Sequence, residues 1–180
     1  GADTVQVCLS KGLGAPVGSV VAGSTEFVDE ARRLRKMLGG GVRQGGVLAA
    51  AGLVALDRID RLADDHRRAR TLADGLRERG WQAAVPQTNI VLIPVADLDG
   101  TLRRFADAGV RAVAMSGQVR LMTHADVDDA DIAVALDRIG APGAGTGEDG
   151  RADGRAAYAP VQRGLRSSGA GRAPARPGGR

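Results

Sequence analysis

The sequence is poor in aromatic residues, in cysteine and in long apolar runs. Aromatic side chains make up only 2% of the 180 residues, so a hydrophobic core must rest on Val, Leu, Ala and Ile. A single cysteine, Cys8, excludes an internal disulfide framework and fits a reducing compartment, so we expect a cytoplasmic protein. No apolar run reaches the roughly 20 residues that a membrane helix needs, so we expect no membrane partner.

Lysine is also scarce. Among the 25 Lys and Arg residues, only Lys11 and Lys36 are lysines. Arginine can supply almost any fixed positive charge, but its guanidinium stays protonated and cannot act as an amine nucleophile. Lys11 lies in SKGLGAPVGS (10–19), between a strand-like run and a glycine-rich loop. A chemical role for Lys11 therefore competes with the plain alternative of a surface lysine in a tight turn.

The positive charge is confined to the end of the chain. Residues 1–140 carry equal numbers of basic and acidic side chains, whereas residues 141–180 carry seven arginines and three acidic residues, which gives the net charge of +4. Gly, Ala, Arg and Pro dominate this end, so we expect a disordered tail. A nucleic-acid-binding arm is the alternative, but the tail lacks aromatic interleaving and RGG repeats, so nucleic acid is not an expected partner.

The hydrophobic pattern predicts two strands and two helices in the first 60 residues. We expect a buried strand over 5–10 and a second, Val-rich strand over 17–23. A helix over 24–38 would be capped by Ser24 or Thr25 and stopped by the glycines at 39–41. A second helix over 43–59 is apolar all round, which predicts burial. The start, GADTVQV, has neither an initiator Met nor a secretory signal, and we expect a chain cut from a longer one.

From residue 60 the pattern predicts a βαββα unit that follows an amphipathic, solvent-facing helix. A small sheet covered by helices on one face would accommodate this order. A boundary between two lobes would fall within the first of these helices. The expected elements are a helix over 60–79, strands over 81–85 and 89–95, a helix over 97–109, strands over 110–116 and 118–124, and a helix over 126–140.

Three kinds of site compete for the glycine-rich loop at Lys11. A phosphate-binding P-loop needs its lysine at the far end, directly before a helix, and a dinucleotide fingerprint also opens a helix. Here the lysine comes first and the strand-like SVVAG follows, so both fail. The third is a Schiff-base lysine, which needs a rigid support and room for a flat ring. The strand end and the small residues around Lys11 supply both.

Two further segments contain candidate anion-binding residues. RKMLGGGVRQGG (35–46) leads into a predicted helix start, where backbone N–H groups and Arg43 could bind an anion. Arg120 is alone in the apolar strand QVRLMTH, and a carboxylate satisfies the planar fork of a buried arginine. An internal Asp or Glu is as good a partner for Arg120 as a substrate carboxylate on this segment alone.

SKGLGAPVGS, RRLRKMLGGGVRQGGVLAAAGLVAL and VRLMTH, in this order and spacing, closely resemble the threonine aldolase and β-eliminating lyase family over residues 1–140. The resemblance implies an α/β chain, the C-terminal part of an aspartate aminotransferase-type fold that depends on pyridoxal 5′-phosphate. Residues 1–60 would be a remnant of the cofactor-binding large domain, 61–140 the small C-terminal α/β domain, and 141–180 a disordered tail.

The resemblance also implies roles for individual residues. Lys11 matches the lysine that holds the cofactor as a Schiff base, and Arg120 matches the arginine that binds the substrate α-carboxylate. Arg43 and, less directly, Lys36 match basic residues near the cofactor phosphate and the active-site entrance. Ser10 and the following glycines shape the surroundings of the lysine.

No metal site is implied. Neither His66 nor His124 matches a catalytic histidine, and we expect ordinary surface or strand-end positions for both.

The implied reaction is aldol cleavage of L-threonine or L-allo-threonine to glycine and acetaldehyde, with a small amino acid as the substrate. The complete enzyme would be a homo-oligomer, a dimer or tetramer. Family members have a further N-terminal half, which supplies the aspartate, the stacking histidine and the phosphate cup of the cofactor site. We therefore expect this chain alone to be weakly active at best. The alternative is a non-catalytic fragment that acts as a binding or interaction module, with a basic tail that contacts nucleic acid.

Overall fold

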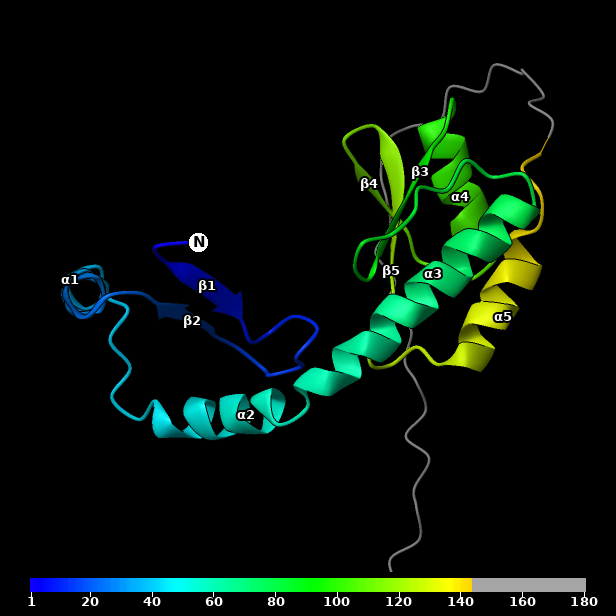
Figure 1. Ribbon diagram of the computed structural model, residues 1–180. Coiled ribbons are helices and arrows are strands. Elements are labelled where there is room, and N and C mark those ends of the chain that lie inside the picture. Colours follow the sequence, from blue (N-terminus) through cyan, green and yellow to red (C-terminus); the bar gives the residue numbers. More distant parts are fainter. Residues whose placement is uncertain (144–180) are drawn as a thin grey trace, which may run out of the picture. The chain divides into compact units, whose positions relative to one another are not determined.

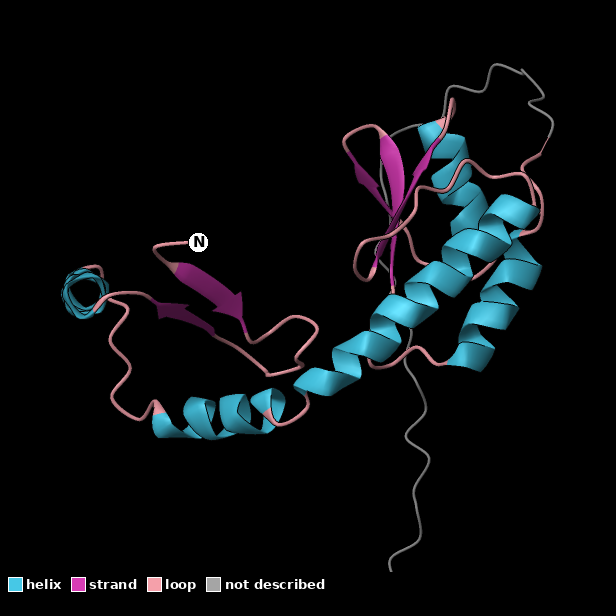
Figure 2. Cartoon of the chain, viewed as in Figure 1, coloured by secondary structure: helices cyan, strands magenta, loops and turns pink. Residues whose placement is uncertain are grey.

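A computed structural model describes residues 1–143. The predicted tail lies outside these residues, apart from its first three positions. Figure 1 colours the elements along the chain, and Figure 2 marks them as helix, strand or loop. They are β1 (Val5–Cys8), β2 (Ser19–Ala22), α1 (Thr25–Met37), α2 (Gly46–Leu56), a short 3-10 turn η1 (Ile59–Arg61), α3 (Leu62–Glu78), β3 (Ile90–Pro94), α4 (Leu98–Asp107), β4 (Val113–Met115), β5 (Gln118–Met122) and α5 (Asp129–Ile139).

The two predicted N-terminal strands form a two-stranded antiparallel ribbon. β1 pairs with β2 from Val5 opposite Ala22 to Cys8 opposite Ser19. The connecting loop folds back on itself, because the Leu9 amide donates to the Gly18 carbonyl at 2.9 Å. Gly18 has φ +117, a conformation that favours glycine. The ribbon thus brings the glycine-rich segment to one end of the paired strands.

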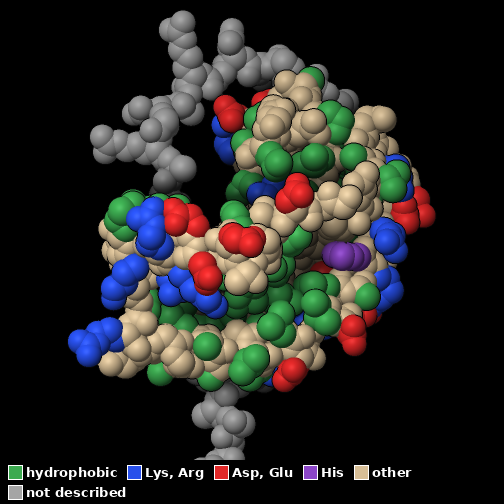
Figure 3. All heavy atoms as spheres, turned by 60° about the vertical axis from the view of Figure 1, so that its left-hand side comes forward, with side chains coloured by type: hydrophobic (Ala, Val, Ile, Leu, Met, Phe, Trp, Pro, Cys, Tyr) green, Lys and Arg blue, Asp and Glu red, His purple; other side chains and the backbone are tan. Residues whose placement is uncertain are grey.

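The predicted burial of the first strand and of the apolar helix that became α2 is wrong. β2 is exposed throughout and β1 is exposed except for the half-buried Cys8. The apolar helix α2 buries only Gly52 and Ala55, and it runs from Gly46 to Leu56 instead of over 43–59. The reason is that the ribbon pairs only with itself and its hydrophobic cluster is small. Many hydrophobic side chains therefore stay at the surface, and Figure 3 shows such side chains gathered on one face. The buried members of the cluster are Leu9, Leu13, Ala15 and Ala55.

Helix α1 has the predicted cap and end. The Phe27 amide donates to the Ser24 hydroxyl at 3.3 Å, and Gly39 follows the helix with φ +81. None of its residues is buried, and its apolar Phe27, Leu34 and Met37 are exposed as well. Polar side chains pair along the helix, for example Arg33 with Glu30 at 2.6 Å.

Helix α3 is amphipathic, as predicted, but it is also a wall of the main core. It spans Leu62–Glu78 after η1 and contacts α5 and β3. Its buried face includes Ala69, Leu72, Ala73 and Leu76, so only the opposite face is solvent-facing. Small residues on this face let α5 approach closely, and Leu136 of α5 lies against Gly75.

The predicted βαββα unit is confirmed. β3, β5 and β4 form an antiparallel sheet in this order, with Leu92 opposite Arg120 and Val113 opposite Arg120 on its other side. Buried residues alternate along β3 and β5, so helices cover one face only (Figure 1). Val91, Ile93, Val119 and Leu121 point into the core, and Arg120 lies on the opposite face.

The predicted strand over 81–85 is absent from the structure. The Trp81 amide closes α3 by donating to Leu76 at 3.0 Å, and its indole N–H donates to the Gly140 carbonyl at 2.8 Å. The Trp81 ring meets Phe105 edge-on, with centroids 5.3 Å apart. Apolar residues alternate here because they anchor a loop in the core. One strand-like bond remains, from the Ala84 amide to the Leu92 carbonyl at 2.8 Å.

The last two helices start at acidic caps. Asp97 accepts from the Gly100 amide at the start of α4. Asp128 and Asp131 form a reciprocal capping box at the start of α5. The main core thus includes all three helices α3, α4 and α5 packed on the sheet, and it is separate from the small cluster near the ribbon. The division into domains at residue 60 stays a prediction. No helix within residues 1–143 is long and apolar enough to span a membrane.

Candidate active site

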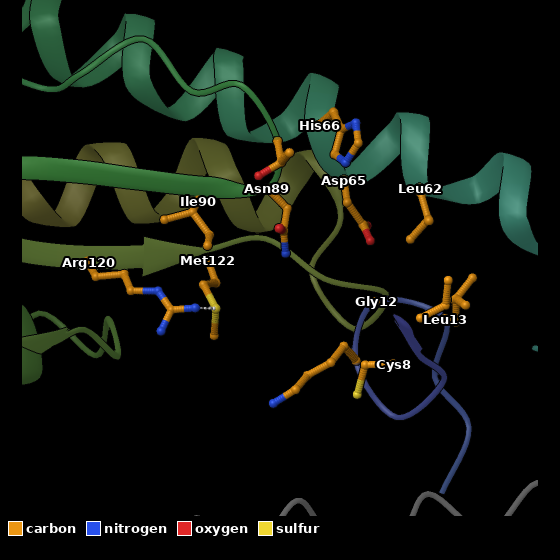
Figure 4. Close-up of a pocket in the computed structure, with 13 residues that line it drawn as sticks. Cys8, Gly12, Leu13, Leu62, Asp65, His66, Asn89, Ile90, Arg120 and Met122 are labelled. Atoms are coloured by element: carbon orange, nitrogen blue, oxygen red, sulfur yellow. Dashed lines mark hydrogen bonds between the residues drawn. The ribbon is translucent and has the colours of Figure 1, made fainter. Parts of the chain in front are cut away.

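A cavity of about 410 Å³ lies where the loop after β1, the start of α3 and the edge of the small sheet face one another (Figure 4). Its volume falls within the roughly 300–1,000 Å³ of small-molecule sites. The lining residues are Val7, Cys8, Lys11, Gly12 and Leu13 of the first segment, Leu62, Asp65 and His66 of α3, Thr88, Asn89 and Ile90 at the start of β3, and Arg120 and Met122 of β5.

Lys11 lines this cavity from a tight turn. The Gly14 amide donates to the Lys11 carbonyl at 2.9 Å, and Gly14 has φ +78, which only glycine adopts easily. Leu13, two residues after Lys11, is buried in the small cluster and anchors the turn there, while Lys11 itself is exposed. The turn therefore presents an amine to the cavity from an anchored backbone.

Arg120 lines the same cavity from the middle of β5, on the sheet face that the helices leave open. Its side chain is half-buried, and one terminal nitrogen lies 2.7 Å from the sulfur of Met122. Its Nε has no hydrogen-bond partner, and none of the ion pairs within residues 1–143 includes it. Of the two partners that the sequence left open, the internal carboxylate is therefore absent from the part of the chain that is described.

Cys8, at the end of β1, and Ser10 directly precede the Lys11 turn in the chain. The Cys8 sulfur lies 3.5 Å from the Ser10 hydroxyl and 4.0 Å from the Gly18 carbonyl. The hydrogen bond with Ser10 is the largest cause that lowers the pKa of the Cys8 thiol, and the Ser19 hydroxyl and the charge of Lys11 act in the same direction. Sequence reasoning considered Cys8 only as a disulfide candidate and missed its place in the cavity.

Asp65 is a buried carboxylate that sequence reasoning also missed. It is only 1% exposed, and its Oδ1 lies 3.3 Å from Arg61 and 3.9 Å from Arg68. Asp65 is one of the lining residues, and its buried Oδ2 has no hydrogen-bond partner within residues 1–143. The i, i+4 spacing of Arg61 and Asp65 could have indicated the pair, but nothing in the sequence indicates its burial.

The two histidines differ. His124 is exposed and accepts from the Asp126 amide at 3.3 Å, which fits the predicted strand-end position. His66 is half-buried and forms part of the cavity wall beside Asp65 (Figure 4), a position that the sequence did not indicate.

The other three predicted site residues, Ser10, Arg43 and Lys36, lie outside the cavity lining, although Ser10 directly precedes Lys11 in the chain. Arg43 is exposed in the turn that precedes α2. Lys36 is exposed in the last turn of α1, where its side chain lies against Gly41. The structure thus places Lys11 and Arg120 in the lining of one cavity, and Ser10, Arg43 and Lys36 outside that lining.

This arrangement has counterparts among solved structures. The crystal structure of a putative aminotransferase from Burkholderia pseudomallei K96243 superposes on 76% of this chain and 44% of its own, with a TM-score of 0.62 at 23% identity. The fold is therefore of the aminotransferase type, and the predicted α/β fold class is confirmed.

The sequence comparison defines the family. The β-eliminating lyase family model matches residues 1–98, and this chain belongs to that family. A probable low-specificity L-threonine aldolase 2 of Arabidopsis thaliana is 44% identical over 146 residues, which are 75% of this chain and 41% of that protein. A low specificity L-threonine aldolase of Escherichia coli (strain K12) is 41% identical over 133 residues, covering 73% of this chain and 40% of the relative. The chain thus spans about two fifths of the length of these curated relatives.

Proposed function

We propose that this chain supplies part of the active site of a pyridoxal 5′-phosphate-dependent lyase that cleaves L-threonine and L-allo-threonine to glycine and acetaldehyde. One observation carries the proposal: Lys11 and Arg120, whose guanidinium has no carboxylate partner within residues 1–143, line a single cavity. The printed names of the two relatives, both low-specificity L-threonine aldolases, support the substrate and the reaction.

The residues present suit the cofactor. Lys11 Nζ is an accessible amine on an anchored turn, and the small residues after it leave space for a flat ring. When bound, pyridoxal 5′-phosphate supplies the electron sink that makes cleavage of the Cα–Cβ bond possible. Ser10 shapes the approach to Lys11, while Arg43 and Lys36 are assigned to the cofactor phosphate and the entrance on the resemblance alone, since they lie outside the cavity described above.

Arg120 binds the substrate α-carboxylate in this proposal. Its planar fork can donate two parallel hydrogen bonds to a carboxylate, which a lysine cannot do. Arg120 is half-buried and its guanidinium lies against Met122, so the local dielectric is lower than in water and the pairing with a carboxylate is stronger. Arg120 would thus hold the amino acid by one end while Lys11 determines where its amino group meets the cofactor.

Borohydride trapping tests the proposal. The full chain is incubated with pyridoxal 5′-phosphate, reduced with borohydride, digested and mapped by mass spectrometry. We expect label on Lys11 and little on Lys36, because only Lys11 lies in the cavity. Lys36→Arg is the matched control and should keep the label, whereas Lys11→Arg should lose it. Equal labelling of both lysines, or none, would refute a specific cofactor site in this chain.

A family member of this kind is expected to act as a homo-oligomer, a dimer or tetramer, and to bind its small amino acid substrate without a nucleic-acid partner. These assembly and partner assignments are part of the proposal. Sedimentation of the full chain over a range of concentrations tests the first of them.

A further inference from the structure

The Lys11 turn is tied to the start of α3 by one arginine. The guanidinium of Arg61 donates through one terminal nitrogen to the Gly12 carbonyl at 2.7 Å. Its other terminal nitrogen donates to Asp65 Oδ1 at 3.3 Å. The two acceptors are 53 positions apart in the sequence, so this single side chain joins the cavity's first segment to its helix wall.

Asp65 is in turn fixed to the sheet. Its backbone carbonyl accepts from the Thr123 hydroxyl at 2.6 Å, and both residues are 1% exposed. The Thr123 amide donates to the Asn89 carbonyl at 3.0 Å, and the Asn89 side chain donates to the Thr123 carbonyl at 2.8 Å. Thr123 directly follows β5, the strand that carries Arg120.

The contact of the turn with α3 is close as well as polar. A Cβ atom built on Gly12 would lie 2.9 Å from Leu62 Cδ2, so any larger residue at this position would require the Leu62 side chain to shift. Leu62 also packs on the small cluster that contains Leu13. Arg61 therefore links the Gly12 carbonyl to the Asp65 carboxylate beside an existing contact between Gly12 and the Leu62 side chain, and it satisfies a backbone carbonyl that would otherwise lose this partner.

We propose that Arg61 is a positioning residue: by bridging Asp65 and the Gly12 carbonyl, it fixes the Lys11 turn relative to the strand that carries Arg120. This inference rests on the proposed function, because the spacing that Arg61 sets is the one between the Lys11 amine and the Arg120 guanidinium that binds the substrate carboxylate. The bridge itself is a physical claim that can be measured without any cofactor.

The choice of arginine follows from the geometry. One side chain must donate to two acceptors on different segments, the Gly12 carbonyl and Asp65 Oδ1. The planar fork of a guanidinium does this with little loss of side-chain freedom. A lysine would keep a charge beside Asp65 but would serve the two acceptors poorly. Arg68, 3.9 Å from Asp65, also balances the carboxylate but has no hydrogen bond to the turn.

Hydrogen exchange of the cofactor-free full chain tests the bridge. In Arg61→Gln we expect the Gly14 and Ala15 amides, which donate within the turn, to exchange roughly tenfold faster, a factor that corresponds to about 1.4 kcal/mol. The matched control is Arg67→Gln, which removes an exposed ion pair between α3 and Asp129 of α5 and should leave these amides unchanged. Unchanged exchange in Arg61→Gln would overturn the inference.

Two further variants separate the bridge from a loss of folding. Arg61→Gln combined with Asp65→Asn removes the buried charge left by the first change, so the core stays folded and the turn should still exchange fast. Arg61→Lys keeps the charge and should restore the stability of the core without full protection of the turn. Full protection in Arg61→Lys would show that charge alone orders the turn, and would overturn the bridge.

Borohydride trapping then separates this inference from the proposed function. Label at Lys11 in the wild-type chain supports the proposed function, and this result does not depend on whether Arg61 has a positioning role. We expect Arg61→Gln to lower the rate of Lys11 labelling about tenfold while Arg67→Gln leaves it unchanged. Equal rates would refute the positioning role with the function intact, whereas an unlabelled wild type with a fast-exchanging variant turn would refute the function and support the bridge.

Discussion

Replacement of Gly75 by alanine sets two effects of opposite sign against each other. Alanine in a helix interior is favoured over glycine by about 1 kcal/mol. The added Cβ, however, would lie 2.5 Å from Leu136 Cδ1 and 2.9 Å from its Cδ2. Leu136 is buried between α3 and α5 and cannot swing into solvent, so overpacking costs roughly 1–3 kcal/mol. The steric term wins, and we expect Gly75→Ala to lower the free energy of unfolding by about 1 kcal/mol.

Urea unfolding followed by tryptophan fluorescence measures this change. Trp81 is the single tryptophan of the chain and belongs to the same core as Leu136, so its emission reports on the packing of α3 and α5. With a slope of roughly 1–3 kcal/mol per molar urea, the midpoint should fall by about 0.3–1 M.

A second variant makes the reasoning refutable. Leu136→Ala alone should cost about 2–5 kcal/mol, because it leaves a cavity in the core. In that background Gly75→Ala meets no clash, and its helix propensity and added volume should stabilise the protein by roughly 0.5–1 kcal/mol. If Gly75→Ala stabilises the wild type, or destabilises the Leu136→Ala background, the close approach of the two helices is not what determines the result.

Two further predictions concern charge. Because its pKa is lowered, chiefly by the hydrogen bond with Ser10, the Cys8 thiol should react with iodoacetamide at pH 7 faster than an unperturbed thiol, and Ser10→Ala should slow it. A rate unaffected by Ser10→Ala would contradict this cause. The pKa of Asp129 is lowered by hydrogen bonds from Arg67 and then Arg68, so the stability it contributes is present at neutral pH and is lost as the pH falls below about 4. Asp129→Asn should therefore flatten the acid limb of a plot of unfolding midpoint against pH.

Local sequence patterns predicted the elements whose ends are determined by neighbouring residues. Ser24 caps α1, and the capping box of Asp128 and Asp131 starts α5, within the predicted helices. The strand that carries Arg120 was also predicted, because the segment QVRLMTH is mostly apolar apart from that arginine and its ends. These features depend on interactions within a few residues, which the sequence displays directly.

The errors came from contacts that are distant in sequence. Trp81 belongs to a loop because its indole reaches Gly140, 59 positions away, and no local pattern shows that bond. The apolar helix α2 was predicted to be buried, but burial depends on what covers a helix and not on its composition. Arg61 and Asp65 resembled an ordinary surface pair for the same reason, since the Gly12 carbonyl and Thr123 are far away in the chain.

The two sides of the cavity, the Lys11 turn and the strand that carries Arg120, differ in how much buried core holds them in place. Arg120 lies on a three-stranded sheet packed on a large buried core, whereas Lys11 follows a two-stranded ribbon with exposed valines and a small cluster of four buried residues. Local opening should therefore release the lysine half at a lower free energy than global unfolding. A preparation can then give a native tryptophan spectrum while its lysine turn is open, so binding competence has to be assayed at Lys11 itself.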